Sequence, residues 1–213
     1  MDFIDRLLLE NRAWAQENSA YDPELFERLS AGQSPRVLWI GCADSRVPAE
    51  QICNAEPGEL FVHRNIANVV AEGDSSRSVL EYAIEVLQVE HIVVCGHHRC
   101  GGIQAALSPE ETGLPHVDRH LEPIRQLRDA HFDTLHPLAE RDRVTTLSEL
   151  NVRAQIELLA RLPLIKKAHE EKRGPTLHGM MYALESGQLR ELVRWPPGST
   201  QSLMTSSAMA LSE

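Results

Sequence analysis

The sequence predicts an α/β fold in which a mainly parallel β-sheet is flanked by helices. Three short, continuous apolar runs, residues 37–40, 60–62 and 91–95, are typical of strands buried on both faces. Between the second and third runs, apolar residues repeat at helical spacing over residues 74–87. Strands that alternate with helices in this way indicate a parallel sheet.

Start and stop signals predict the remaining elements. Helices are expected at residues 1–30 (two helices, the second opening at Pro23), from Gly101 onward, and from a capping-box sequence at 146–149 to about Leu162. A fourth strand is expected at 176–184, followed by a hairpin at Ser186-Gly187 that leads into residues 189–193. We expect one domain over residues 1–195, with N-terminal helices, and a polar, partly disordered tail over 196–213.

Composition excludes several classes of protein. The 213 residues carry a net charge of −10, which argues against electrostatic binding to nucleic acid or to an anionic membrane. Four cysteines are too few for a disulfide scaffold, and no stretch approaches the roughly 20 apolar residues of a membrane span. The acidic N-terminus does not resemble a secretory signal, so we expect a cytoplasmic protein with reduced thiols.

Potential metal ligands follow two of the predicted strands directly. Cys42 follows the first strand, and His97 and Cys100 follow the third. The carboxyl ends of parallel strands meet at one edge of a sheet, and two thiols with an imidazole are natural zinc ligands. Three protein ligands leave a fourth position open, for water or for the carboxylate of Asp44. Arg46 can hold that carboxylate away from the metal.

Each of these residues has an ordinary structural interpretation when taken alone. A single His-x-x-Cys is more often accidental, and a lone cysteine such as Cys42 more often packs as a small buried residue. The combination at two strand ends is the stronger signal. The spacing to Cys100 favours His97 over His98 as the ligand, and we expect Cys53 and Cys95 to be core residues.

The motifs in which these residues lie resemble those of the β-class carbonic anhydrases, in particular a bicarbonate-regulated bacterial-type subgroup. The resemblance rests on Gly41–Val47, Pro57–Val62, Arg64–Asn68, Cys95–Gly102, Glu149–Val152, His178-Gly179 and Tyr182. It implies a zinc ion on Cys42, His97 and Cys100, and Asp44 and Arg46 as the catalytic pair. It also implies reversible hydration of carbon dioxide to bicarbonate and a proton, through attack by zinc-bound hydroxide, and a homo-oligomer, either a dimer or a tetramer.

The resemblance also assigns residues outside the zinc site. It implies a substrate pocket lined by Gln33, Phe61, Tyr82 and Gly102, although core packing is an equal alternative for the two aromatic rings. It further implies an allosteric bicarbonate site formed by Trp39, Arg64 and Tyr182. In that subgroup, bicarbonate favours a closed state in which Asp44 leaves Arg46 and becomes the fourth zinc ligand.

Two segments depart from the family pattern, and other functions stay open. His98-Arg99 replaces smaller or aromatic residues, and residues 71–76 differ from the subgroup's usual segment. A relative that acts on another cumulated substrate, such as carbon disulfide, would use the same nucleophile. A non-catalytic zinc protein is disfavoured because a purely structural site has no use for the Asp44–Arg46 pair. No phosphate-binding glycine loop follows any predicted strand, which disfavours a nucleotide-binding domain.

Overall fold

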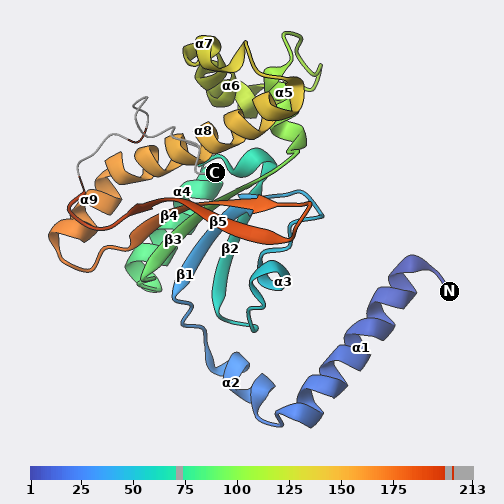
Figure 1. The fold of residues 1–213 in the computed structure, drawn as a ribbon. Coiled ribbons are helices and arrows are strands. Elements are labelled where there is room, and N and C mark those ends of the chain that lie inside the picture. The colour runs from blue at the N-terminus through green and yellow to red at the C-terminus, as the bar shows by residue number, and fades with distance from the viewer. Residues whose placement is uncertain (71–73, 200–202, 204–213) are drawn as a thin grey trace. The chain divides into compact units, whose positions relative to one another are not determined.

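The computed structural model describes residues 1–70, 74–199 and 203. The chain forms two compact units, Met1–Ser34 and Pro35–Glu213. The second unit is an α/β structure with a mostly parallel sheet flanked by helices, which confirms the predicted fold class (Figure 1). The predicted tail at 196–213 falls largely on residues outside the described ranges, as do positions 71–73 of the segment that departs from the family pattern.

The N-terminal unit consists of the two predicted helices, α1 (Phe3–Tyr21) and α2 (Leu25–Ala31). The side chain of Asp2 caps α1 by accepting a hydrogen bond from the amide of Phe3. The rings of Trp14 and Phe26 meet edge to face, with centroids 5.8 Å apart, and so join the two helices. No residue of α1 is buried, and its apolar side chains are exposed to solvent.

The second unit is built on a five-stranded sheet in the order β2-β1-β3-β4-β5. Its strands are β1 (Val37–Cys42), β2 (Leu60–Asn65), β3 (His91–His97), β4 (Thr176–Ala183) and β5 (Gln188–Trp195). The first four are parallel, and β5 returns antiparallel to β4 after the predicted hairpin. The four predicted strands and the hairpin are therefore confirmed.

Helices flank this sheet, and α5, α6 and α7 are grouped beyond one end of it (Figure 1). They are α3 (Ala49–Cys53), the 3₁₀ turn η1 (Ile66–Asn68), α4 (Asp74–Glu81), the π-helical turn η2 (Tyr82–Val86), α5 (Gly101–Leu107), α6 (Pro115–Ala130), α7 (Phe132–Leu135), α8 (Glu140–Arg161) and α9 (Pro163–Glu170). The predicted helix start at 146–149 is wrong, because α8 already begins at Glu140. Within this segment, the Ser148 hydroxyl donates to the carbonyl of Val144 one turn earlier in the same helix.

Three apolar clusters hold the second unit together. On one face of the sheet, side chains of β1, β3 and β4 pack against α4, α8 and α9. On the other face, Trp39, Val93 and Cys95 pack against Ala49 of α3. The third cluster joins α5, α6, α7 and the first half of α8 around Cys42 and Cys100. The carboxyl ends of β1 and β3 therefore lie beneath a helical cover.

The two cysteines outside the predicted metal site differ in their surroundings. Cys95 is buried within β3, as expected. Cys53 is exposed at the last position of α3, so its predicted place in the core is wrong. The reason is that α3 is only one turn long and buries Ala49 at its first position, leaving its last residue outside.

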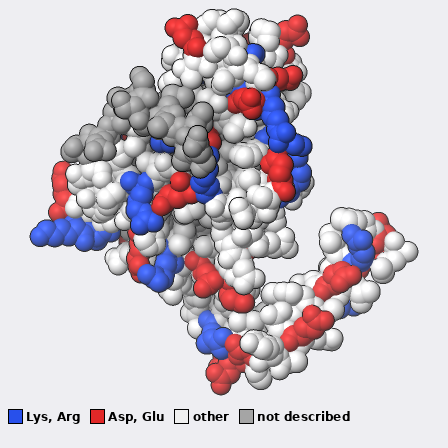
Figure 2. Space-filling view, in the orientation of Figure 1, with Lys and Arg blue, Asp and Glu red and all other residues white. Residues whose placement is uncertain are grey.

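Acidic and basic side chains are interspersed over the face shown in Figure 2. Among the described helices, none is both long enough and apolar enough to cross a membrane.

Candidate metal centre

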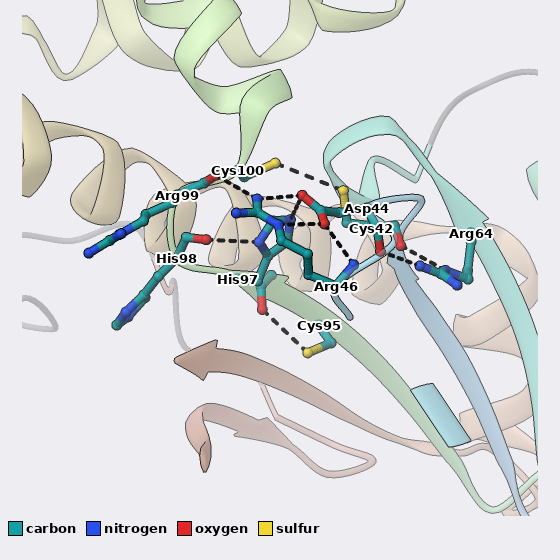
Figure 3. Close-up of polar contacts among 10 residues, drawn as sticks. Cys42, Asp44, Arg46, Arg64, Cys95, His97, His98, Arg99 and Cys100 are labelled. Atoms are coloured by element: carbon teal, nitrogen blue, oxygen red, sulfur yellow. Dashed lines mark hydrogen bonds and ion pairs between the residues drawn. The ribbon is translucent and has the colours of Figure 1, made fainter. Parts of the chain in front are cut away.

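Cys42, His97 and Cys100 converge at the carboxyl edge of the sheet (Figure 3). Cys42 is the last residue of β1, His97 is the last residue of β3, and Cys100 immediately precedes α5. Because β1 and β3 are parallel neighbours, their ends bring residues 55 positions apart together. The ligand atoms all lie within 4.8 Å of one another, and no other such group of three or more occurs among the described residues.

The spacing of these atoms fits a tetrahedral zinc ion. The two sulfur atoms are 3.9 Å apart, far longer than a disulfide. With Zn–S bonds of about 2.3 Å, tetrahedral geometry places two sulfur ligands about 3.8 Å apart. All three side chains are buried, with exposed fractions of 7% for Cys42 and 1% each for His97 and Cys100.

The histidine is oriented so that one ring nitrogen is available as a ligand. Nδ1 of His97 lies 2.8 Å from the carbonyl oxygen of His98 and donates its proton there. Nε2 is buried and has no hydrogen-bond partner among the described residues. A buried nitrogen without a partner is costly, and a metal ion removes that cost. The donor set therefore fits zinc, and His97 rather than His98 is the histidine positioned to bind it.

The two thiols lie within hydrogen-bonding distance of each other and affect each other's ionisation. The hydrogen bond from Cys100 lowers the pKa of the Cys42 thiol to about 4, and His97 and the amides of Asp44 and Ala67 act in the same direction. The same contact, followed by burial, raises the pKa of Cys100. A divalent cation between the sulfurs favours both thiolates, since opposite charge stabilises the ionised form.

Asp44 and Arg46 form a bidentate ion pair beside the three ligands. Nε of Arg46 lies 2.9 Å from Oδ1 of Asp44, and Nη2 lies 2.7 Å from Oδ2. The amide of Arg46 also donates to Oδ1, at 2.9 Å. These bonds hold the pKa of Asp44 well below its ordinary value, with the guanidinium as the largest cause. Oδ2 remains 3.9 Å from Nε2 of His97, so the carboxylate borders the ligand group.

Arg64 binds the backbone of the segment that carries Cys42 and Asp44 (Figure 3). Its Nε donates to the carbonyl of Cys42 at 2.8 Å, and its Nη2 donates to the carbonyl of Asp44 at 2.6 Å. Strand register and the alternation of side chains place Arg64 on the same face of the sheet as Trp39 and Tyr182. The indole Nε1 of Trp39 lies over Gly41, only 2.7 Å from where a β-carbon would stand.

The predicted substrate-pocket residues lie in three places. Gly102 is in the first turn of α5, next to the metal ligands. Phe61 and Tyr82 lie together, with ring centroids 5.9 Å apart. Phe61 is four residues before the end of β2, so it is about 13 Å along the sheet from the edge that carries the ligands. Gln33 belongs to the N-terminal unit.

Glu185 is a neighbour of the site that the sequence did not indicate. Its carboxylate binds Nδ1 of His98 at 3.2 Å and Nε of Arg99 at 3.0 Å. Arg99 in turn accepts a hydrogen bond from Arg46 on its carbonyl, at 3.3 Å. The unusual His98-Arg99 pair is thereby fixed to the turn after β4. No local pattern could reveal a contact across 87 residues.

Comparison with known proteins identifies this arrangement with one family. Residues 37–189 match the family described as "Carbonic anhydrase". A protein of Emericella nidulans named carbonic anhydrase is 44% identical over 191 residues, covering 88% of this chain and 82% of that protein.

Solved structures give the same result. A tetrameric β-carbonic anhydrase of Sordaria macrospora has a TM-score of 0.87 and 39% identity, covering 91% of this chain and 98% of the other. The Coccomyxa β-carbonic anhydrase, in complex with acetazolamide, has a TM-score of 0.88 and 35% identity, covering 93% and 90%.

Proposed function

This chain belongs to the β-class carbonic anhydrase family, and we propose that it interconverts carbon dioxide and bicarbonate with Asp44 and Arg46 as its catalytic pair. The observation that carries the proposal is the buried, unpartnered Nε2 of His97 beside the sulfurs of Cys42 and Cys100. Zinc held by these three atoms supplies a Lewis acid that lowers the pKa of a bound water to about 7.

The residues beside the ligands can orient the oxygen that attacks carbon dioxide. In hydration, an oxygen–carbon bond forms between water and carbon dioxide, and one proton leaves. Asp44 stays ionised because Arg46 holds both its oxygens, so Oδ2 can accept a hydrogen bond from the attacking oxygen and orient its lone pair. In this structure Asp44 is paired with Arg46. This pairing supports an open state of the site, in which Asp44 does not ligate the metal.

The test of this function is stopped-flow hydration of carbon dioxide by the zinc-loaded protein. We expect rapid hydration that a chelator abolishes and added zinc restores. Acetazolamide, which is bound in the Coccomyxa structure, provides an independent check by inhibition. A zinc-loaded, folded chain that does not hydrate carbon dioxide would overturn the proposal.

We also propose that bicarbonate regulates the enzyme at Trp39, Arg64 and Tyr182. The three residues share one face of the sheet, and Arg64 joins that face to the loop that carries Cys42 and Asp44. An anion that drew the guanidinium away would release both carbonyls, and the Asp44 backbone would become free to move. The bonds from Arg64 to this loop therefore support the proposal that a bound anion changes the pairing of Asp44 with Arg46.

Substitution of Arg64 tests the regulatory proposal. Arg64→Ala should relieve inhibition by bicarbonate and leave the zinc content unchanged. Arg36→Ala is the matched control, since it removes the same charge from an exposed pair with Glu90 at the opposite end of β1. If inhibition persists unchanged in Arg64→Ala, the regulatory site is not here.

We further propose that the protein is a homo-oligomer, a dimer or a tetramer, in which Phe61 and Tyr82 serve the zinc site of another copy. In a single chain, Phe61 lies about 13 Å along the sheet from the edge that carries the ligands, and Tyr82 is 45% exposed. The fully unburied α1 offers additional apolar surface for association, and the Sordaria macrospora relative is tetrameric.

Mixed oligomers test the shared pocket. A Cys100→Ser chain lacks a ligand, and a Phe61→Ala/Tyr82→Ala chain lacks the two rings. If the rings serve a neighbouring copy, a co-refolded mixture regains hydration activity that neither chain has alone. If they serve their own chain, the mixture stays as inactive as its parts, and light scattering separately reports the oligomeric state.

The cytoplasm is the compartment that we propose for this enzyme. Cys42 and Cys100 must stay reduced to bind zinc, and a reducing compartment maintains them in that state. Cell fractionation tests this directly: recovery in an oxidising compartment would contradict it.

A further inference from the structure

The loop after β2, residues Asn65–Val70, has an unusual backbone beside the metal centre. Ala67 has φ of 59° and Asn68 has φ of 47°, both in the left-handed region that side-chain-bearing residues rarely adopt. Ala67 is fully buried and packs in the same cluster as Cys42 and Cys100. Gly102 lies against this loop so closely that a β-carbon there would come within 2.7 Å of Ile66 and 3.0 Å of Ala67.

Side chains, rather than a regular backbone ladder, hold this loop in place. Asn65 bridges its two ends by bonding both the amide and the carbonyl of Val69, at 2.9 and 2.7 Å. His120 of α6 bonds the carbonyl of Ile66 at 2.8 Å. Backbone that departs from regular structure needs such partners, because its buried polar groups otherwise stay unsatisfied.

The most deeply buried support comes from two amides one turn apart on α8. Asn151 donates from Nδ2 to the carbonyl of Ala67 at 2.9 Å. Gln155 donates to Oδ1 of Asn151 at 2.9 Å and accepts from the amide of Val70 at 2.8 Å. Asn151 is 1% exposed and Gln155 5% exposed, so water cannot replace these bonds. The chain of amides fixes both the carbonyl of Ala67 and the amide three residues later.

The loop held in this way packs against the metal ligands. Ala67 lies in one buried cluster with Cys42 and Cys100. At the start of the loop, the carbonyl of Asn65 accepts a hydrogen bond from the amide of Ala43, the residue after Cys42, at 2.7 Å. Groups outside the ligands that fix the surrounding backbone orient the ligands and affect how tightly the metal is bound.

We propose that Asn151, supported by Gln155, is a positioning residue for the metal centre: it holds the left-handed turn that packs against Cys42 and Cys100. The two side chains touch neither substrate nor metal and act through the backbone of one loop. This inference rests on the zinc site of the proposed function but not on hydration activity, because metal affinity and the spectrum of the metal site report it directly.

Asn151→Ala is the first test. Loss of an outer hydrogen-bond partner typically weakens metal binding about 10–100-fold, and we expect an increase of this size in the zinc dissociation constant, measured by chelator competition. In the cobalt(II)-loaded protein, the thiolate-to-metal charge-transfer band should also shift, because a displaced loop changes the position of the Cys42 sulfur at the metal. Ser148→Ala is the matched control, since it removes another buried polar group of α8 whose bond stays within the helix.

Gln155→Met provides a second route if Asn151→Ala does not fold. This substitution keeps the side-chain length but removes both amide contacts, so the same two changes are expected with smaller size. In the double variant, the effects should not add, because both residues act through one loop. A folded Asn151→Ala or Gln155→Met protein with unchanged zinc affinity and an unchanged cobalt spectrum would overturn the inference. Weak hydration with normal metal binding would instead count against the proposed function.

Discussion

Arg46 binds both carboxylate oxygens of Asp44, at 2.9 Å from Nε to Oδ1 and 2.7 Å from Nη2 to Oδ2. The pair is two residues apart in sequence, and the amide of Arg46 completes a short turn by bonding Oδ1. Asp44 therefore has a fixed direction beside Cys42 and His97 before any substrate arrives. This preorganisation suits the proposed catalytic role of the carboxylate.

The first prediction concerns the ionisation of Asp44. Its pKa is lowered from 3.8 chiefly by Arg46, so the pair contributes stability above about pH 4 that is lost as the pH falls through the lowered pKa. Asp44 should thus stay ionised throughout the neutral range and contribute no acid limb to the hydration profile there. In Arg46→Gln, the Asp44 pKa should rise toward 3.8, as followed by carboxyl-carbon NMR. An identical titration in both proteins would show that Arg46 is not the cause.

The second prediction concerns the role of Asp44. Asp44→Asn should retain zinc, because the three ligands are untouched, but lose hydration activity by about 10²–10⁴-fold, the usual contribution of a positioned proton acceptor. Asp129→Asn is a matched control, since it neutralises an exposed carboxylate paired with Arg128. Metal analysis and stopped-flow rates are measured on both. Full activity in Asp44→Asn would remove it from the mechanism.

The third prediction uses two adjacent glycines at the start of α5. Gly102→Ala should destabilise the fold by about 1–3 kcal/mol, because its β-carbon would press against Ile66 and Ala67. Gly101→Ala has nothing within 4 Å and should be neutral or slightly stabilising. Denaturant unfolding of the zinc-loaded proteins compares them. Equal stability would mean that α5 does not pack closely on the loop at Asn65–Val70.

The fourth prediction concerns the reactivity of the thiols before and after the metal is removed. With zinc bound, an aqueous thiol reagent should label Cys53, the exposed cysteine, and leave Cys95 unlabelled. After chelation, Cys42 should react as well, since the hydrogen bond from Cys100 keeps its pKa low and its thiolate is the nucleophile. Mass spectrometry identifies the labelled sites. The ligand assignment is contradicted if chelation leaves the labelling of Cys42 and Cys100 unchanged.

Local sequence patterns predicted the strands and the metal ligands because both depend on short-range signals. Apolar runs that end at Gly41 and Gly96 mark β1 and β3, and the spacing of His97 and Cys100 places both in one turn. The first residues of helices were harder to predict. The apparent capping box at 146–149 lies inside α8, because burial of this part of the helix against α5, α6 and α7 outweighs the local cap preference.

Long-range supports of the site could not be found from sequence. The contacts of Glu185 with His98 and of Asn151 with Ala67 span 87 and 84 residues, and only the packed fold brings these groups together. The exposure of Cys53 depends similarly on which residues of the one-turn helix α3 are buried. Such positions are set by tertiary packing rather than by residue type.

The most direct test of the metal centre compares two cysteine substitutions in one experiment. Metal content and carbon dioxide hydration are measured on each protein. Cys100→Ser removes a ligand, whereas Cys53→Ser removes an exposed thiol outside the site. We expect Cys53→Ser to keep stoichiometric zinc and full hydration, and Cys100→Ser to lose tightly bound zinc and hydration together. Full zinc occupancy and activity in Cys100→Ser would contradict the assignment of the metal centre.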